Sequence, residues 1–360
     1  MIPFVDLAAA HAEVDAEVRE GFDRVLAGTA FVQGPDVAEF EREYAAFCRT
    51  AHCVGLGNGT DALELALRAV GVGPGSEVVL PANTFVATAE AVARAGARPV
   101  LVDPDPGTLL MDPLAALQAV GASTAAIVPV HLFGRLAPMD LLLHAGVPVV
   151  EDAAQSQGAE RDGRRTFGAI AATSFYPGKN LGAYGDAGAV VTASPDLARS
   201  VRLLANHGSE RKYHHETLGF NSRLDTLQAV VLRAKLRRLE TWNARRQTAA
   251  ARYAELLADV PGVVLPPQPP PGEHVWHLYV IRVPDRDRVL AALNDAGIGC
   301  GIHYPDPVHL TPAFRHLGHA RGDFPAAEKA AAEILSLPMH PHLTEAHQHQ
   351  VAAALREALH

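Results

Sequence analysis

Short apolar segments alternate with amphipathic segments between residues 52 and 151, and this alternation restricts the fold more than any other feature of the 360-residue chain. Residues 60–70 are predicted to form a helix because Leu63, Ala66 and Leu67 recur at helical spacing. A second helix is expected at 84–94. Strands are expected at 53–56, 77–80, 99–102, 125–130 and 147–151. This order predicts an α/β fold with a mostly parallel central sheet covered by helices on both faces.

A long helical stretch follows the alternating region. Residues 224–257 contain no proline or glycine, which predicts one long helix that bridges two units, and residues 266–272 are mostly proline and predict a stiff, extended spacer. A smaller α+β unit is predicted from a strand at 275–283, a helix at 286–294 and two later helices. Because 48% of the residues are hydrophobic, the chain can bury two cores. We therefore expect a large unit at residues 1–240 and a small C-terminal unit at residues 241–360.

Charge and cysteine content narrow the possible partners. The formal net charge is -9 and the chain has no run of lysine or arginine, so nucleic acid is not an expected partner. The N-terminal segment lacks a basic stretch, and no apolar stretch is long enough to cross a bilayer, which predicts a cytoplasmic protein without membrane contact. The three cysteines match neither a disulfide framework nor a zinc spacing. The C-terminal histidines lack carboxylate or cysteine partners at ligand spacing, so no metal site is predicted.

Lys179 lies in a turn-forming segment between two apolar segments. Pro177 and Gly178 precede it, and Asn180 and Gly182 follow closely, which favours a fixed turn. A lysine that forms a Schiff base with an aldehyde cofactor must be held rigidly and be partly desolvated, so that its neutral form is accessible near pH 7. Lys179 is therefore a candidate for such an amine. The alternative is an ordinary lysine in a surface loop.

A glycine-rich turn at residues 55–61 joins a predicted strand to a predicted helix. Backbone N–H groups and the positive end of the helix could hold a phosphate there, although such a turn is also common for purely geometric reasons. The turn fits neither the Walker pattern nor a good dinucleotide fingerprint. Thr60 could cap the helix, bind phosphate, or do both.

Asp152 follows the apolar strand at 147–151, which places it at the carboxyl end of a parallel strand, where open α/β sheets bind ligands. A carboxylate buried there requires a cationic partner. A protonated pyridine nitrogen would be such a partner, and the ion pair would keep the ring able to accept electrons. The alternative is a helix cap.

Three further segments carry candidate binding residues. Phe85 follows a strand and could stack on a flat cofactor ring or belong to the core. The polar segment at 221–228 opens the long helix. The segment at 301–309 sets His303, Tyr304 and His309 on a loop between prolines, which suits recognition of a polar ligand or a structural turn.

These segments together resemble the DegT/DnrJ/EryC1/StrS family of sugar aminotransferases. The motifs that carry the resemblance, in the family's order, are Gly-Asn-Gly-Thr-Asp-Ala-Leu, Pro-Ala-Asn-Thr-Phe-Val-Ala-Thr, Glu-Asp-Ala-Ala-Gln, Ser-Phe-Tyr-Pro-Gly-Lys-Asn-Leu-Gly, Asn-Ser-Arg-Leu-Asp-Thr-Leu-Gln-Ala and Gly-Ile-His-Tyr-Pro. The resemblance covers nearly the whole chain. It implies a fold-type I enzyme, like aspartate aminotransferase, that depends on pyridoxal 5'-phosphate and forms a homodimer with active sites at the interface.

The resemblance also implies a role for each residue. Lys179 would carry the cofactor and move the proton, and Asp152 would face the pyridine nitrogen. Gln155 would lie at the phenolic oxygen and Phe85 at the ring face. The phosphate would be held by Gly59, Thr60, Ser174 and the partner's Asn221.

The implied donor is L-glutamate, and the implied acceptor is a nucleotide-linked (dTDP or UDP) keto-deoxysugar that gains an amine at C-3. Substrate contacts would come from His303, Tyr304, His309, Tyr184 and Arg223. Two departures from the family pattern, Asp306 and Phe133, leave cofactor binding untouched and weaken the inference about the sugar.

Four alternatives stay open within the resemblance. The acceptor could be a 4-keto nucleotide sugar, or a keto-cyclitol or aminobenzoate precursor. A few relatives are sugar dehydratases, but these have histidine in place of the lysine. A non-catalytic regulator could also retain the fold, although Lys179 and the acidic net charge argue against it.

Overall fold

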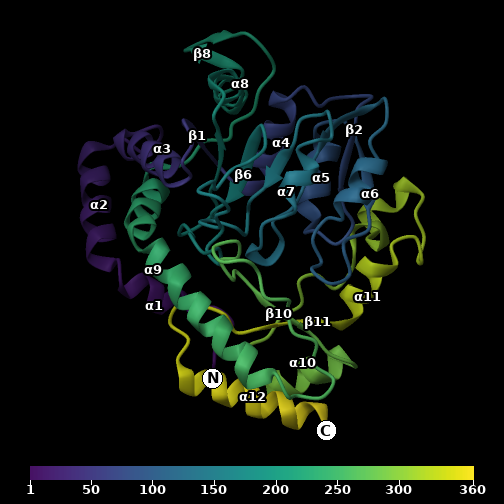
Figure 1. Ribbon diagram of the computed structural model, residues 1–360. Helices are drawn as coiled ribbons and strands as arrows, with labels where there is room; N and C mark the ends of the chain where they lie inside the picture. The colour runs from purple at the N-terminus through teal and green to yellow at the C-terminus, as the bar shows by residue number, and fades with distance from the viewer.

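The computed structural model describes residues 1–360 and shows a large α/β part above a smaller part that contains both chain termini (Figure 1). Three helices that the sequence patterns did not predict open the chain. They are α1 (Leu7–Ala12), α2 (Asp15–Gly28) and α3 (Pro35–Phe47). Helices α2 and α3 pack on the long helix α9 (Thr226–Leu257), so the N-terminal segment covers one side of the large part.

The central sheet follows the predicted alternation. Its strands are β1 (His52–Leu56), β2 (Glu77–Pro81), β3 (Arg98–Val102), β4 (Thr124–Ile127), β5 (Val150–Asp152), β6 (Ile170–Ser174) and β7 (Gly188–Thr192). One group has the order β3-β2-β4 and the other β1-β7-β6-β5, and parallel bridges from Ile127 to Val149 and from Val130 to Asp152 join them. Only β7 runs antiparallel to its neighbours. The predicted α/β class with a mostly parallel sheet is confirmed.

Helices cover this sheet and enclose the largest apolar core. They are α4 (Gly59–Ala69), α5 (Val86–Arg94), α6 (Pro113–Gln118), the 3-10 turn η1 (Leu132–Gly134), α7 (Met139–Leu142) and α8 (Pro195–Ala205). Thirty buried residues, many from α4, α5, β2 and β6, form the core. Several predicted boundaries shift. Strand β4 ends at Ile127 because Pro129 has no N–H to donate, and α5 begins at Val86 because Phe85 is extended (φ -62°, ψ 142°). Strand β5 begins at Val150, three residues later than predicted, and ends at Asp152.

A second core of 21 buried residues lies in the smaller part. It is built from the end of α9 and from β10 (Tyr279–Arg282), α10 (Arg286–Asp295), β11 (Ile334–Leu337) and α12 (Glu345–Leu359). The intervening elements η2 (Val308–Leu310), η3 (Pro312–Leu317) and α11 (Pro325–Glu333) instead add Val308, Phe314 and Ala327 to the core of the large part. The predicted strand at 275–283 is shorter than expected because Trp276 has a positive φ of 49°, which breaks the extended backbone.

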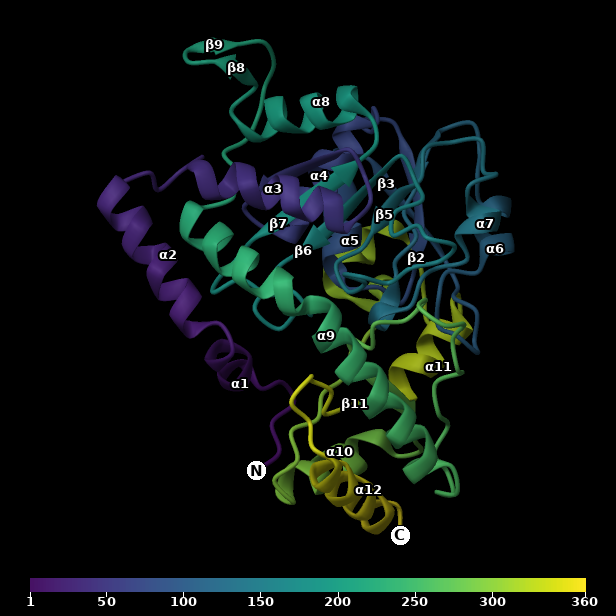
Figure 2. The ribbon, with the colours of Figure 1, turned by 60° about the vertical axis from the view of Figure 1, so that its left-hand side comes forward.

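Helix α9 belongs to both parts of the molecule, as Figure 2 shows. It packs on α2 and α3 in the large part and on α12 in the small part, so the predicted boundary between residues 240 and 241 falls inside this helix. Ile2, at the other end of the chain, also packs in the second core. The division into two units at this boundary stays a prediction.

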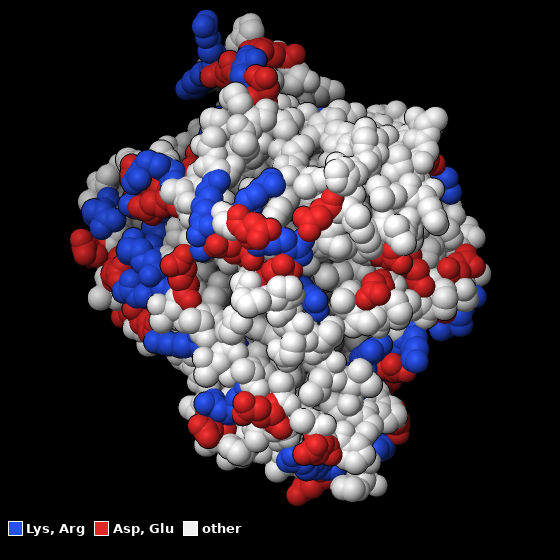
Figure 3. Space-filling model, in the orientation of Figure 1, with Lys and Arg blue, Asp and Glu red and all other residues white.

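Ion pairs fasten α9 to the N-terminal helices. Arg233 pairs with Asp36 and Glu43 at 2.5 and 2.8 Å, and Arg237 pairs with Glu17. Figure 3 shows positive and negative side chains intermingled on the left of this face, where α2 and α3 lie in the same view of the ribbon. None of the helices combines the length and the apolar character needed to cross a membrane.

A small hairpin projects from the large part. It consists of β8 (Ser209–Arg211) and β9 (His214–His215) and stands clear of the sheet at the top of Figure 1. Tyr213 at its tip and Leu218 just beyond it are 84% and 93% exposed.

Candidate active site

A cavity of ≈ 830 Å³ opens at the carboxyl ends of the parallel strands. Segments far apart in the sequence line it, including residues 4–7 from the N-terminus and residues 277–278 and 303–304 from the small part. The residues predicted from the sequence that line this cavity are Gly59, Thr60, Phe85, Asp152, Gln155, Ser174, Lys179, His303 and Tyr304. The location agrees with the rule that open α/β sheets bind ligands at this edge.

Lys179 lies in the loop between β6 and β7, and this loop is fixed on both sides of the lysine. The Lys179 N–H donates to the carbonyl of Tyr176 at 2.8 Å, and the side chain of Asn180 donates to Asn243 and to the carbonyl of Val275 at 2.9 and 3.0 Å. Burial lowers the pKa of the Lys179 amine to about 8, against the smaller opposing effect of Asp152. With this pKa, roughly a tenth of the amine is neutral at pH 7, far more than for an ordinary lysine, and a Schiff-base lysine requires this neutral form.

Asp152 ends β5 and is 5% exposed. The hydroxyl of Thr88 donates to its Oδ2 at 2.7 Å, and the Ala154 N–H donates to its Oδ1 at 3.2 Å. Burial raises the pKa of Asp152, and these two hydrogen bonds and the nearby Lys179 oppose the increase. No helix begins after Asp152, so it is not a helix cap. The carboxylate faces the cavity and is available to a cation there.

The start of α4 forms a cradle at the cavity. Asn58 caps this helix by accepting from the Asp61 N–H at 2.8 Å, so Thr60 is not the cap. Asn58 pairs the Asp61 N–H, and the N–H groups of Gly59 and Thr60 have no partner within the helix and suit a phosphate. A Cβ added to Gly59 would lie 2.6 Å from the Cβ of Ser174, so only glycine permits this close approach of the two cavity walls. The cradle fits the phosphate of the predicted cofactor.

Phe85, Gln155 and Tyr304 form one contact group in the cavity. The rings of Phe85 and Tyr304 have centroids 5.1 Å apart, and Phe85 is 49% exposed. Gln155 donates to the Tyr304 hydroxyl at 3.1 Å and accepts from the Phe133 N–H at 2.6 Å. Phe85 is therefore not part of the core, and an open aromatic face is available to a flat ring.

Four predicted residues do not line this cavity. Asn221 is exposed, and Arg223 donates to Asn206 at 3.3 Å. Tyr184 contacts His11 through its hydroxyl, with Lys235 over its ring at 4.6 Å. His309 is buried against Phe324, and its Nε2 lies 2.9 Å from a carboxylate oxygen of Glu328.

Other cavity residues were missed in the sequence. Thr88 does not line the cavity itself but donates to Asp152, and although it lies within a motif that was singled out, nothing in the motif assigned a role to its hydroxyl. The Nδ1 atom of His277 lies 3.2 Å from the side-chain oxygen of Asn180, and burial lowers the pKa of His277 well below its usual value. Phe4 stacks on His303 with centroids 5.4 Å apart. His277 and Phe4 carried no spacing signal because distant segments bring them to the cavity.

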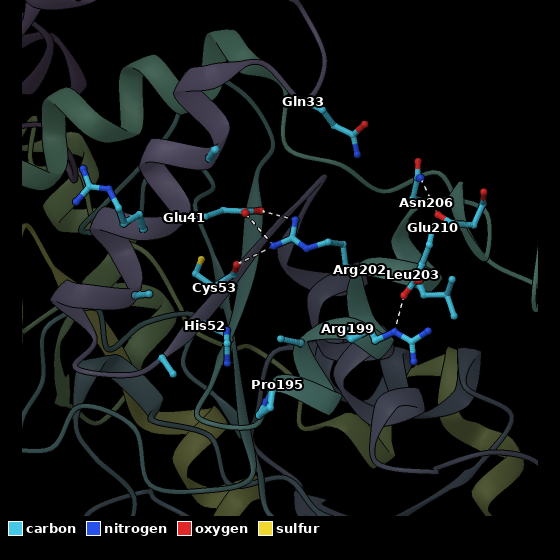
Figure 4. Close-up of a pocket in the computed structure, with 16 residues that line it drawn as sticks. Gln33, Glu41, His52, Cys53, Pro195, Arg199, Arg202, Leu203, Asn206 and Glu210 are labelled. Carbon is cyan, nitrogen blue, oxygen red and sulfur yellow. Dashed lines mark hydrogen bonds and ion pairs between the residues drawn. The ribbon is translucent and has the colours of Figure 1, made fainter. Parts of the chain in front are cut away.

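A second hollow of ≈ 710 Å³ lies between α3, β1 and α8 (Figure 4). Its arginines are already neutralised: Arg202 pairs with Glu41 at 2.9 Å and Arg199 with Glu210 at 2.5 Å. Arg42 pairs with Glu39 at 2.6 Å. The residues of the predicted chemistry all lie elsewhere, so we assign the active site to the first cavity.

The mostly parallel sheet, with a desolvated lysine and a buried carboxylate facing one cavity, defines the fold-type I class of pyridoxal phosphate enzymes. The chain belongs to the DegT/DnrJ/EryC1/StrS aminotransferase family, whose model matches residues 12–356. The predictions of the family, of an aminotransferase and of pyridoxal 5'-phosphate as cofactor are confirmed.

Similar proteins cover almost the whole chain. The chain is 51% identical to the erythromycin biosynthesis sensory transduction protein EryC1 of Saccharopolyspora erythraea, with 98% of each chain covered. It is 47% identical to the dTDP-3-amino-3,4,6-trideoxy-alpha-D-glucose transaminase of Streptomyces venezuelae, with 99% of this chain and 96% of that protein covered. The crystal structure of S. venezuelae DesV in complex with a ketimine intermediate has a TM-score of 0.96 at 47% identity, covering 99% and 98% of the two chains.

Proposed function

We propose that this aminotransferase moves an amino group from L-glutamate to the C-3 keto group of a nucleotide-linked keto-deoxysugar. The observation that carries the amino transfer is that Lys179 and Asp152 face the same cavity as the Gly59 cradle. The sugar acceptor is supported by the similarity to a dTDP-3-amino sugar transaminase over nearly the full length. The free cysteines fit a reducing compartment, and we place the enzyme in the cytoplasm.

The roles of the residues follow from their positions. When bound, pyridoxal phosphate supplies an aldehyde to carry the amino group and a ring that accepts electrons. Lys179 would hold that aldehyde and, once displaced, would move a proton from the α-carbon of the donor to the carbon of that aldehyde; on the acceptor half of the cycle it would move a proton in the reverse direction. Asp152 would keep the ring nitrogen protonated, and Gly59, Thr60 and Ser174 would hold the phosphate. Phe85 would cover one ring face, and Gln155 would lie at the phenolic oxygen.

The acceptor contacts are proposed for the loop from the small part. His303 and Tyr304 reach the cavity and have aromatic partners in Phe4 and Phe85. His303 and Tyr304 would therefore form one side of the sugar-binding site. His309, which is held by Glu328 outside this cavity, would contact a nucleotide only through another surface.

An acceptor panel tests the substrate. The purified protein, loaded with cofactor and glutamate, is incubated separately with 3-keto and 4-keto sugars linked to dTDP or UDP, and with keto-cyclitols. We expect the mass of the product to show amination of a 3-keto nucleotide sugar, together with formation of 2-oxoglutarate. Amination of 4-keto sugars alone would overturn the C-3 assignment and leave the aminotransferase class intact.

We further propose a homodimer in which each copy completes the other's active site. Asn221, Arg223 and Tyr184 do not line their own cavity, and the projecting hairpin with Tyr213 leads directly into Asn221. A twofold dimer would let this exposed hairpin, with Tyr213 at its tip, pack against the second copy. Asn221 would then reach the cofactor phosphate of the other subunit.

Hybrid dimers test this arrangement. Asn221→Asp places a negative charge against the phosphate, and Lys179→Ala removes the amine; each homodimer is expected to be defective. If Asn221 serves the opposite site, a purified hybrid of the two chains contains one wholly intact site and shows about half the wild-type activity per dimer. If Asn221 serves its own site, both sites of the hybrid are damaged and the activity stays at the level of the defective parents.

A further inference from the structure

Two threonine hydroxyls form a buried chain that ends on Asp152. The Oγ1 atoms of Thr84 and Thr88 lie 2.7 Å apart, and Oγ1 of Thr88 lies 2.7 Å from Oδ2 of Asp152. Thr84 and Thr88 are 2% and 1% exposed, so water does not compete for these bonds. Both residues come from the segment that begins α5 and face the end of β5.

The direction of this chain is fixed by the number of protons. A hydroxyl has one proton to donate, and an ionised carboxylate can only accept. Thr88 therefore gives its proton to Asp152, and the bond between the two threonines must be donated by Thr84. Both hydroxyl dipoles point toward the carboxylate, and hydrogen bonds in series strengthen one another. This arrangement favours the ionised form of Asp152.

No other side chain donates a hydrogen bond to Asp152. The Ala154 N–H donates to the opposite oxygen at 3.2 Å. The titratable groups that face Asp152 are Lys179, His131 and Tyr304. His131 accepts from the Ala137 N–H at Nδ1, so its Nε2–H must donate to Glu151, at 2.9 Å, and is not available to Asp152. Thr88 is thus the single side-chain donor to a carboxylate that burial disfavours as an ion.

We propose that Thr88, oriented by Thr84, is a positioning residue that keeps Asp152 ionised and fixes which carboxylate oxygen is presented to the cofactor ring nitrogen. Because Oδ2 accepts from Thr88 and Oδ1 from Ala154, the carboxylate is held on both sides and cannot rotate freely. This inference rests on the assignment of Asp152 as the partner of that nitrogen.

The test uses the full-length protein and pyridoxal phosphate itself. Thr88→Val removes the hydroxyl with little change of shape, Thr88→Ser restores it, and Thr84→Val removes only the donor to Thr88. The matched control is Thr192→Val in β7, a buried threonine that donates to the Ala169 carbonyl at 2.7 Å and does not line the cavity. The apo-protein is titrated with pyridoxal phosphate to obtain Kd, and the absorption of the bound cofactor is recorded against pH.

We expect Thr88→Val to raise Kd by about 10-fold or more, as for loss of a hydrogen bond to a charged group. The pH at which the absorption changes should rise. A ring that loses its positive charge withdraws fewer electrons from the nitrogen that joins Lys179 to the cofactor, so that nitrogen holds its proton to a higher pH. Thr88→Ser should return Kd to within about 3-fold of wild type and should return the pH of the absorption change toward the wild-type value. Thr84→Val should raise both quantities, but by less than Thr88→Val does.

Equal Kd values and equal absorption profiles for Thr88→Val and Thr192→Val would overturn the proposal. If Thr88→Val does not fold, the Thr84→Val variant tests the proposal instead. An unchanged absorption profile in Thr84→Val would refute the hydrogen-bond series from Thr84 through Thr88 to Asp152. A wild-type protein that binds no pyridoxal phosphate would instead refute the cofactor assignment, whereas failure to aminate the acceptor panel leaves the role of Thr88 untouched. The two kinds of failure are therefore distinguishable.

Discussion

Replacing Lys179 with alanine is expected to lower kcat/KM for amino transfer by roughly 10²–10⁴-fold through loss of the proton-transferring group alone. The amine has a pKa lowered to about 8 by burial and is the lysine that lines the cavity beside Asp152. Without it, no nearby side chain can both hold the cofactor aldehyde and move the proton. Steady-state kinetics with glutamate and a keto sugar, and single-turnover release of 2-oxoglutarate, measure the loss.

The control for this variant is Lys329→Ala. The Lys329 side chain is 70% exposed and lies 3.9 Å from Glu333, which is a surface pair of small energetic value. Both variants should unfold at temperatures close to that of the wild-type apo-protein. Wild-type turnover by a folded Lys179→Ala protein would refute the assignment of the active site.

Replacing Asp152 with asparagine is expected to lower kcat/KM by about 10²–10³-fold, the usual effect of removing one preorganised electrostatic group. The amide keeps the shape of the carboxylate but cannot stabilise a protonated ring nitrogen. The effect should appear in kcat more than in KM, because the charge matters most when electrons move into the ring. Kinetics of both half-reactions give this separation.

The same variant should be more stable than the wild-type apo-protein at neutral pH. Burial raises the pKa of Asp152 above the ordinary value of an aspartate, so the folded state binds a proton more tightly than the unfolded state. Ionisation of Asp152 therefore lowers the free energy of unfolding. The decrease becomes larger as the pH rises from about 4 through the pKa of Asp152 in the folded state. Thermal unfolding of the two apo-proteins should give a difference in Tm at pH 7 that shrinks toward pH 4.

Asp140→Asn is the matched control for this stability measurement. The Asp140 side chain is 79% exposed and lies 3.4 Å from Arg161, so its removal should leave both activity and the pH dependence of Tm almost unchanged. If Asp152→Asn is less stable than wild type at every pH, the ionised Asp152 carboxylate does not destabilise the folded protein, and the prediction is wrong.

Much of the sheet and of the cofactor site could be predicted from local patterns. The strand before Asp152 is apolar and short, and the carboxyl ends of parallel strands share one edge, so Asp152 and the Gly59 turn were expected near each other. The prediction for Thr60 as a helix cap failed because Asn58, two residues earlier, offers its own side-chain oxygen. The end of β4 was misplaced because the apolar run continues past Ile127 although Pro129 has no N–H to donate.

Contacts between distant segments could not be predicted in this way. The position of His309 depends on Glu328, and the position of Tyr304 on Gln155. Nothing in the short segment at 301–309 distinguishes a residue that reaches the cavity from one that turns away. The conformation of Trp276, which shortens β10, similarly depends on its stacking with His274 at 3.9 Å and on the surrounding core.

The long helix α9 has a mechanical consequence. Its middle section holds the loop of Lys179, since Lys235 donates to the Gly182 carbonyl at 2.7 Å and Asn243 accepts from Asn180. One turn further on, Arg246 donates to the carbonyl of Met339 in the small part at 2.8 Å. A rotation of one part against the other would therefore bend a single continuous rod and pull on the catalytic loop. A substitution that breaks this helix should therefore loosen the small part and the catalytic loop together.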